Sequence, residues 1–129
     1  MNAIPLIFNC VFNDFDFNSL RSLSSVLNST NNELLLQRNL LPKLIVFKFH
    51  LILSDLHEVI NHKNTKGYKF NSYILNLLII KIEYILSVLR PKSSINLLSI
   101  IEDLEHSLSI LKELLQSKFE ETIDFEPFP

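Results

Sequence analysis

Residues 97–115 read LLSIIEDLEHSLSILKELL, and the spacing of apolar residues in this stretch decides the fold class. They recur at alternating steps of four and three residues, at Leu97, Ile101, Leu104, Leu108, Leu111 and Leu115. Such spacing keeps one face of an α-helix apolar over about three heptads. Ile100 and Leu114 flank this seam and make the apolar stripe wider than a two-stranded coiled coil requires. We therefore expect a helix, opening at Ser93 or Ser94, that packs against more than one neighbour.

The most apolar run of the chain is YILNLLIIKIEYILSVL, residues 73–89. A helix that spans a membrane needs about 20 largely apolar residues. Lys81 and Glu83 lie near the centre of this run, and each would cost about 2.5–3.5 kcal/mol on membrane insertion scales. We therefore expect a buried central helix and no membrane span. Asn71 or Ser72 caps its start, and it ends before the proline at position 91.

The first half of the chain carries weaker helical signals. A stripe of leucines predicts a first helix that is capped by Asn18 or Ser19. The polar cluster NSTNN at residues 28–32 is typical of a loop, so we expect this first helix to end there. A second helix is expected over residues 33–41, capped by one of the last two asparagines of that cluster.

Pro42 interrupts the helical pattern because it lacks a backbone donor, so we expect a kink or a new helix at this point. Beyond it, apolar residues recur at steps of three and four as far as Val59, which predicts a helix to about His62. Residues 63–69 then form a loop that contains three lysines and a tyrosine.

The two ends of the chain differ from its helical middle. Residues 6–17 open with alternating apolar residues, which is typical of a strand or an extended arm. Residues 119–129 are acidic and contain proline, so we expect them to be irregular. The sequence therefore predicts an all-α fold with three parts: an extended N-terminal arm over 1–17, a bundle of four to five helices over 18–118, and an acidic aromatic tail over 119–129.

Composition restricts the class of partner. The apolar fraction of the 129 residues is 47% and the mean hydropathy is +0.23, which indicates that some apolar surface faces a partner. The net charge of −2 provides no basic field for a polyanion and disfavours nucleic acid. A single cysteine, Cys10, excludes an internal disulfide framework, and the first residues lack the basic start of a signal peptide. We therefore expect an intracellular protein, cytoplasmic or nuclear.

The sequence lacks the common signatures of enzymes. Gly67 is the only glycine, so no glycine-rich phosphate loop or nucleophile elbow is present. The stretch HEVINH at 57–62 resembles the zinc-protease signature, but that site needs histidines four residues apart on one helical face. His57 and His62 are five residues apart, which places them roughly 140° apart around a helix. We therefore expect no zinc site here.

Two further sets of residues give only weak signals of a metal site or of a catalytic nucleophile. Asp103 and His106 form one partial copy of a di-iron motif that needs ligands from several helices. Cys10 lies among apolar residues, where a cysteine usually behaves as a small hydrophobe. We expect no catalytic, cofactor-binding or metal-binding residue, and we infer no small-molecule substrate.

Candidate contact residues lie at both ends and in the seam. Phenylalanines flanked by acids resemble docking peptides, in which aromatic anchors fill pockets of a basic partner. The alternative is that these rings pack onto the bundle itself. The candidate partner-binding residues are Phe15, Phe17, Leu104, Leu108, Leu111, Phe125 and Phe128.

The predicted function is a non-enzymatic protein–protein interaction module: a small subunit or adaptor of a complex, or a homo-oligomer. It would bind through an apolar face made by the central and last helices. Two alternatives stay open. One is a small helical enzyme or nuclease with a site around His50 and His57. The other is a nucleic-acid adaptor that uses the loop from Lys63 to Lys69, where lysines alternate with an aromatic residue.

Overall fold

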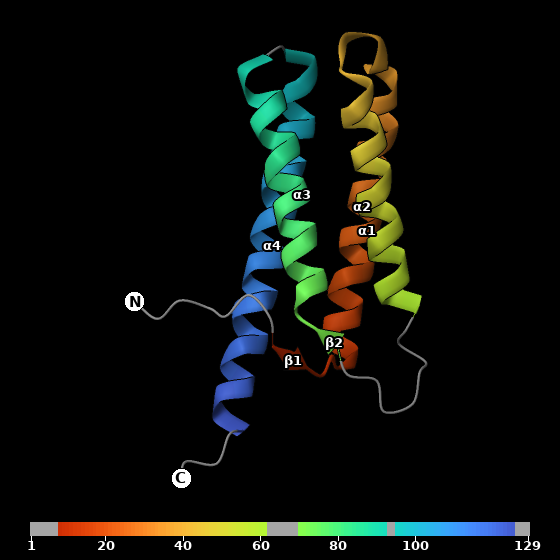
Figure 1. Ribbon diagram of the computed structural model, residues 1–129. Helices are drawn as coiled ribbons and strands as arrows, with labels where there is room; N and C mark the ends of the chain where they lie inside the picture. The colour runs from red at the N-terminus through yellow and green to blue at the C-terminus, as the bar shows by residue number, and fades with distance from the viewer. Residues whose placement is uncertain (1–7, 62–69, 93–94, 126–129) are drawn as a thin grey trace.

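The computed structural model describes residues 8–61, 70–92 and 95–125, and it confirms the all-α fold (Figure 1). Two 3₁₀ turns cover Arg38–Leu40 and Arg90–Lys92. Two short strands, β1 (Asn9–Cys10) and β2 (Phe70–Asn71), pair antiparallel with Asn9 opposite Asn71. The helices of the described residues are α1 (Asp14–Leu36), α2 (Lys43–Asn61), α3 (Tyr73–Leu89) and α4 (Ile95–Phe125).

The four helices form a ring in which each helix contacts two neighbours. α1 packs on α2, α2 on α3, α3 on α4, and α4 closes the ring against α1. Successive helices are antiparallel, as in an up-down-up-down bundle (Figure 1). The C-terminal ends of α1 and α3 lie at one end of the bundle, and the two strands lie at the other. Among the helices of the described residues, none has the length and apolarity to cross a membrane.

The first helix differs from the prediction at both of its ends. It begins at Asp14 because Asn13 and Asp16 form a capping box: the Asn13 side chain accepts from the Asp16 amide, and the Asp16 carboxylate accepts from the Asn13 amide, each at 2.8 Å. The extended arm is therefore described over residues 8–13, whereas residues 14–17 are the first turn of α1.

The predicted loop at residues 28–32 is wrong, because α1 continues through it to Leu36. Two of the polar side chains there, those of Asn28 and Thr30, bond to their own helix or to α4. Asn28 donates to the Ser24 carbonyl at 2.9 Å. The buried Thr30 hydroxyl lies 2.9 Å from the Val26 carbonyl and 3.2 Å from an Asp103 carboxylate oxygen. A polar cluster with such acceptors within reach can remain helical.

The separate helix expected over residues 33–41 is also wrong. Its first residues belong to α1, and a 3₁₀ turn links them to Pro42. The helical pattern breaks at Pro42, as the sequence predicts, and α2 begins at the next residue, Lys43. The Pro42 carbonyl accepts a hydrogen bond from the Ile45 amide at 3.0 Å.

The last helix is longer than predicted. Residues 119–125, expected to be irregular, complete α4, which ends at Phe125. Packing supports this extension, because the Phe119 ring lies 5.5 Å from the Phe8 ring of the arm. Lys118, one residue earlier, is buried. Residues 126–129 of the predicted tail lie outside the described residues.

The arm crosses one end of the bundle and is held there by the segment before α3. The Phe8 amide donates to the Ser72 hydroxyl, and the Ser72 amide donates to the Phe8 carbonyl, both at 2.8 Å. Cys10 and Phe12 are buried against the core. The arm therefore covers apolar side chains that the helices alone would leave open.

Candidate functional site

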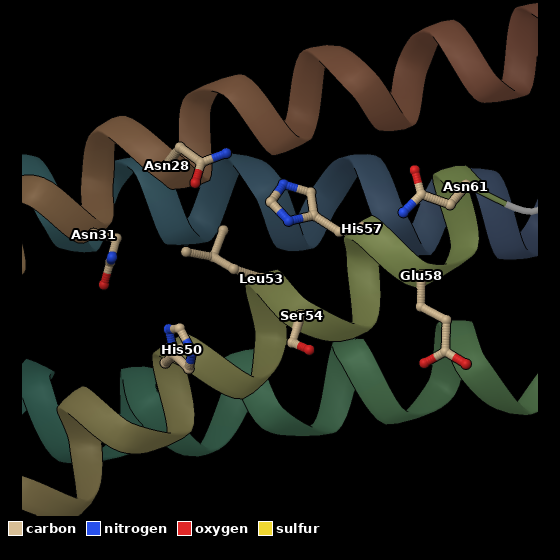
Figure 2. Close-up of a pocket in the computed structure, with 8 residues that line it drawn as sticks. All are labelled: Asn28, Asn31, His50, Leu53, Ser54, His57, Glu58 and Asn61. Carbon is tan, nitrogen blue, oxygen red and sulfur yellow. The ribbon is translucent and has the colours of Figure 1, made fainter.

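A polar groove lies between α1 and α2. Its volume is about 770 Å³. Two asparagines come from α1, and the remaining lining residues come from α2 (Figure 2). The groove is lined by Asn28, Asn31, His50, Leu53, Ser54, His57, Glu58 and Asn61. We call it the α1–α2 groove.

The helical repeat explains why both histidines face this groove. His50 and His57 are seven residues apart, close to two turns of helix, so they project from one side of α2. Figure 2 shows the Leu53 side chain between them, whereas the Glu58 carboxylate points away from His57 and from α1. Histidine is the side chain that enzymes use most often as a general acid or base, so the two histidines are the feature of the groove that could take part in proton transfer. Within the described part of the chain, no three histidine, cysteine, aspartate or glutamate side chains gather as a metal site.

The motifs singled out in the sequence do not meet at one site. Asn61, at the position where the zinc signature needs its second histidine, lines the groove, and His62 lies outside the described residues. His106 is exposed on α4. Its neighbour Glu105 pairs with Arg90 at 3.3 Å, on the exposed surface. Residues 63–69 also lie outside the described residues.

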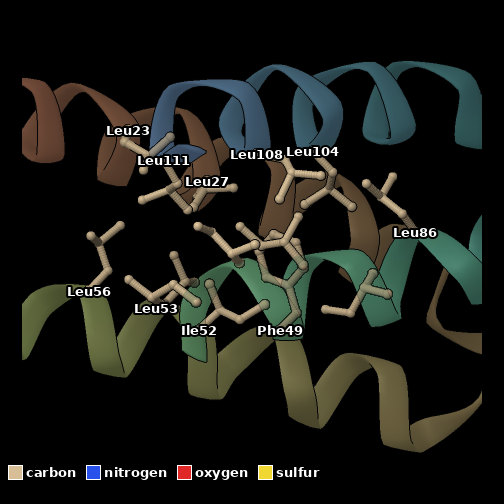
Figure 3. Packing of buried hydrophobic residues seen from close by; sticks show 14 of the residues in the cluster. Leu23, Leu27, Phe49, Ile52, Leu53, Leu56, Leu86, Leu104, Leu108 and Leu111 are labelled. Carbon is tan, nitrogen blue, oxygen red and sulfur yellow. The ribbon is translucent and has the colours of Figure 1, made fainter. Parts of the chain in front are cut away.

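The three candidate leucines of the seam belong to the core. Leu104, Leu108 and Leu111 are buried within the single chain, where they face side chains of α1 and α2 (Figure 3). They are therefore removed from the set of surface contact residues. Helix α4 buries its wide apolar stripe by packing against α3 and α1.

The candidate phenylalanines differ in how far their side chains are exposed. Phe15 is 76% exposed on the first turn of α1. Phe17 is buried, with its ring edge-on to Phe12 at 5.8 Å, so here the alternative of packing onto the bundle holds. Phe125 is the last residue of α4, and Phe128 lies outside the described residues.

A buried ion-pair cluster joins the arm, α1 and α4. Lys118 is 1% exposed, and its ammonium group lies 2.5 Å from Asp16 and 2.8 Å from Glu121. It also donates to the Val11 carbonyl at 3.0 Å. Burial lowers the pKa of Lys118, but the hydrogen bonds to Asp16 and Glu121 outweigh burial and leave this pKa above its ordinary value. The cluster therefore holds a charged lysine in place.

Cys10 lies beside this cluster and is unsuited to nucleophilic chemistry. Burial raises the pKa of its thiol to about 11, against a smaller opposing effect of Lys118. The thiolate is the reactive form of cysteine, and at neutral pH this thiol keeps its proton. The side chain therefore serves as a small apolar group in the core.

A second surface feature, which the sequence analysis did not single out, is apolar. Leu44 and Phe47 of α2 are 51% and 59% exposed, and Ile80 and Tyr84 of α3 are 58% and 41% exposed. We call this surface the α2–α3 face. Its signal in the sequence is a set of apolar residues in 43–61 that falls off the core stripe of that helix.

Polar contacts tie the two helices together within this face. The Lys48 ammonium group lies over the Tyr84 ring, 4.6 Å from its centre. Lys81 of α3 forms an ion pair with Asp55 of α2 at 2.5 Å. These contacts cross from one helix to the other, so the exposed apolar residues of α2 and α3 lie on one continuous side of the bundle.

The groove and the face are therefore described from the geometry of this chain alone. No protein-family model matches the sequence, and no curated protein or solved structure matches it either.

Proposed function

We propose that the protein is a non-enzymatic interaction module, acting as a small subunit or adaptor of a complex or as a homo-oligomer, and that it binds through the α2–α3 face. One observation carries the proposal: four large apolar side chains are 41–59% exposed on two adjacent helices. The core of the same bundle is filled by other residues. Contiguous exposed apolar side chains on a small domain are typical of an interaction surface.

The face differs from the one that the sequence suggested. In this proposal the central helix contributes Ile80 and Tyr84, which are exposed. The last helix does not, because its seam leucines are buried in the core. Its place is taken by α2, whose outward side carries Leu44 and Phe47.

The size of the face sets an expectation for affinity. Full burial of a large apolar side chain contributes about 1.5–3 kcal/mol relative to exposure, so four that are about half-exposed contribute on the order of 3–6 kcal/mol. Association costs about 4–15 kcal/mol in lost freedom of motion. The face therefore binds measurably only to a partner that supplies apolar side chains of its own.

Affinity capture from extracts of the source organism, with mass spectrometry, tests the proposal. Ile80→Asp, on the face, is compared with Leu98→Asp, a matched control of similar exposure (55%) on α4. We expect the wild-type chain and the Leu98 variant to capture the same proteins, and the Ile80 variant to lose them. Retention of all partners by Ile80→Asp, with its fold intact, would contradict the proposal.

A second candidate function is a small helical enzyme or nuclease, and the α1–α2 groove favours it because His50 and His57 line the same groove. In this proposal the histidines act as general acid and base. Incubation of the full chain with labelled single-stranded RNA and DNA tests it. Cleavage that His57→Ala abolishes and His106→Ala, an exposed control on α4, retains would favour this candidate over a binding module.

A third candidate, a nucleic-acid adaptor that uses the loop from Lys63 to Lys69, stays a prediction because that loop lies outside the described residues. The same labelled probes test it by gel shift, with the lysines of the loop replaced by glutamine.

A further inference from the structure

The outward side of α2 carries a continuous stripe of side chains. It is formed by Leu44, Phe47, Leu51, Asp55 and Glu58, which recur at steps of three and four residues. We call these five residues the α2 stripe. Leu44, Phe47 and Glu58 are exposed, and Leu51 and Asp55 are partly exposed. Such spacing keeps the stripe on one side of the helix, where a second helix can lie along it.

Charges of opposite sign are separated along this helix. Lys43 and Lys48 lie in its first half, and Asp55 and Glu58 lie in its second half. The outer pair, Lys43 and Glu58, and the inner pair, Lys48 and Asp55, are both centred within half a residue of Leu51. Antiparallel pairing of two such helices about Leu51 would therefore place each lysine opposite a carboxylate of the partner copy.

This charge order is unfavourable within a single helix. The N-terminus of a helix carries a partial positive charge and its C-terminus a partial negative charge, so lysines at the start and acids at the end oppose the helix dipole. Helix α2 has no acidic residue in its first turn and no basic residue in its last. An antiparallel second copy reverses this, because it brings carboxylates to the start of α2 and lysines to its end.

The rest of the α2–α3 face does not oppose self-association. Of the charged residues of α3, Lys81 pairs with Asp55 of α2, and Glu83 pairs with Lys112 of α4. The three lysines and three acids of α2 and α3 sum to no net charge over these two helices, so neither sign dominates there. A two-fold contact requires the same patch to be complementary to itself, which a patch of one sign cannot be.

We propose that the partner of the α2–α3 face is a second copy of this chain, with the two α2 helices antiparallel about a two-fold axis at Leu51. The inference rests on the proposed function of this face as a binding surface. It adds the identity of the partner and the orientation in which it binds.

Charge exchange on the full-length chain tests the orientation. Lys43→Glu with Lys48→Glu makes the charges along α2 wholly acidic, and Asp55→Lys with Glu58→Lys makes them wholly basic. In sedimentation velocity we expect each variant alone to self-associate at least about tenfold more weakly than the wild-type chain, because like charges meet. An equimolar mixture of the two should recover association to within about threefold of wild type, because every opposed pair is again of opposite sign.

Matched variants keep the test informative if Asp55→Lys, which removes the ion pair with Lys81, does not fold. The single changes Lys43→Glu and Glu58→Lys, both at exposed positions, exchange the outer pair alone and are expected to complement one another in the same way. Glu102→Lys is the control for Glu58→Lys, since it makes the same change in net charge at an exposed position of α4.

The outcomes separate this inference from the proposed function. A wild-type chain that stays monomeric up to about 100 μM, in a range where weak dimers are seen, would overturn the inference. The face would then still stand as a binding surface if Ile80→Asp abolishes capture of a different protein. A dimer that Ile80→Asp dissociates but the charge variants leave unchanged would overturn the antiparallel arrangement. A dimer that neither change affects would overturn the use of this face in self-association.

Discussion

The Lys118 ammonium group lies where the N-terminal arm, α1 and α4 meet, and it neutralises the buried Asp16 carboxylate. Removal of the lysine leaves that carboxylate buried without a counter-charge. Loss of one partner from a buried pair typically costs about 3–5 kcal/mol. We therefore expect Lys118→Met to lower the free energy of unfolding by about that amount in urea titrations.

A matched control lies on the same helix. Lys112 pairs with Glu83 at 3.8 Å, and both side chains are more than half exposed. Exposed pairs contribute about 0–1 kcal/mol, so Lys112→Met is expected to change stability by less than about 0.5 kcal/mol. Equal losses for the two methionine variants would show that the burial of Lys118 has no energetic consequence.

The titration of Cys10 predicts a loss of stability in alkali. Its pKa is raised from 9.0 to about 11 in the folded chain, chiefly by burial. As the pH rises through 9, the unfolded chain releases this proton first, so the folded state loses stability between pH 9 and about 11. Urea midpoints measured from pH 7 to 11 should fall in this range. In Cys10→Ala the fall in the urea midpoint between pH 9 and about 11 should be smaller, whatever the midpoint of this variant at pH 7.

Lys118 adds a second loss at higher pH. Its burial lowers the pKa, but the bonds to Asp16 and Glu121 raise it by more, so the folded-state pKa lies above 10.5. The stability from this cluster is fully present below pH 10.5 and is lost as the pH rises through the folded-state pKa. A urea midpoint that is constant to pH 11 in the wild-type chain would contradict both assignments.

At the scale of single elements, α3 and the seam of α4 could be predicted from sequence, whereas the extent of α1 and the last turns of α4 could not. Steps of three and four residues mark the core face of α4 without knowledge of its neighbours. The polar cluster within α1 remains helical in part because Thr30 meets Asp103 of α4, 73 residues away. Local composition carries no sign of that acceptor, so the cluster was interpreted as a loop.

The buried ion pair and the exposed apolar side chains could not be predicted from sequence for a related reason. Lys118 and Asp16 are more than one hundred residues apart, and neither lies in a pattern that indicates the other. The exposure of Phe47 and Ile80 follows from which sides of α2 and α3 meet neighbouring helices, which is a property of the tertiary fold. The spacing of the α4 seam is compatible with a core or an interface, and the fold places its leucines in the core.

The seam of α4 predicts a contrast within one helical turn. Leu108 is buried in the core, and truncation of a buried leucine to alanine typically costs about 2–5 kcal/mol. Lys112, four residues later, is exposed, and Lys112→Ala should change stability by no more than about 0.5 kcal/mol. Thermal melts of Leu108→Ala should show a large decrease in Tm at every protein concentration. A silent Leu108→Ala would contradict the role of residues 97–115 as the core seam.

For the molecule as a whole, self-association predicts that stability depends on concentration. A dimer that forms only from folded chains raises Tm as the protein concentration rises. We expect the wild-type Tm to increase over a hundredfold range of concentration. Ile80→Asp should melt at one temperature throughout, because it removes association at a position that is already 58% exposed and so leaves the monomer folded. A concentration-independent wild-type Tm would argue against an assembled state.

The N-terminal arm also imposes an order in time on the assembly of the chain. Lys118 bonds the Val11 carbonyl across 107 positions of sequence, and Ser72 bonds Phe8 across 64. A ribosome adds about 5–20 residues per second. Roughly 5–20 seconds therefore pass between the synthesis of the arm and the synthesis of Lys118. Throughout that interval Cys10 and Phe12 lack the part of the core formed by α4. The arm is therefore synthesised well before the residues that complete its contacts, and it is among the last parts of this bundle to reach its final packing.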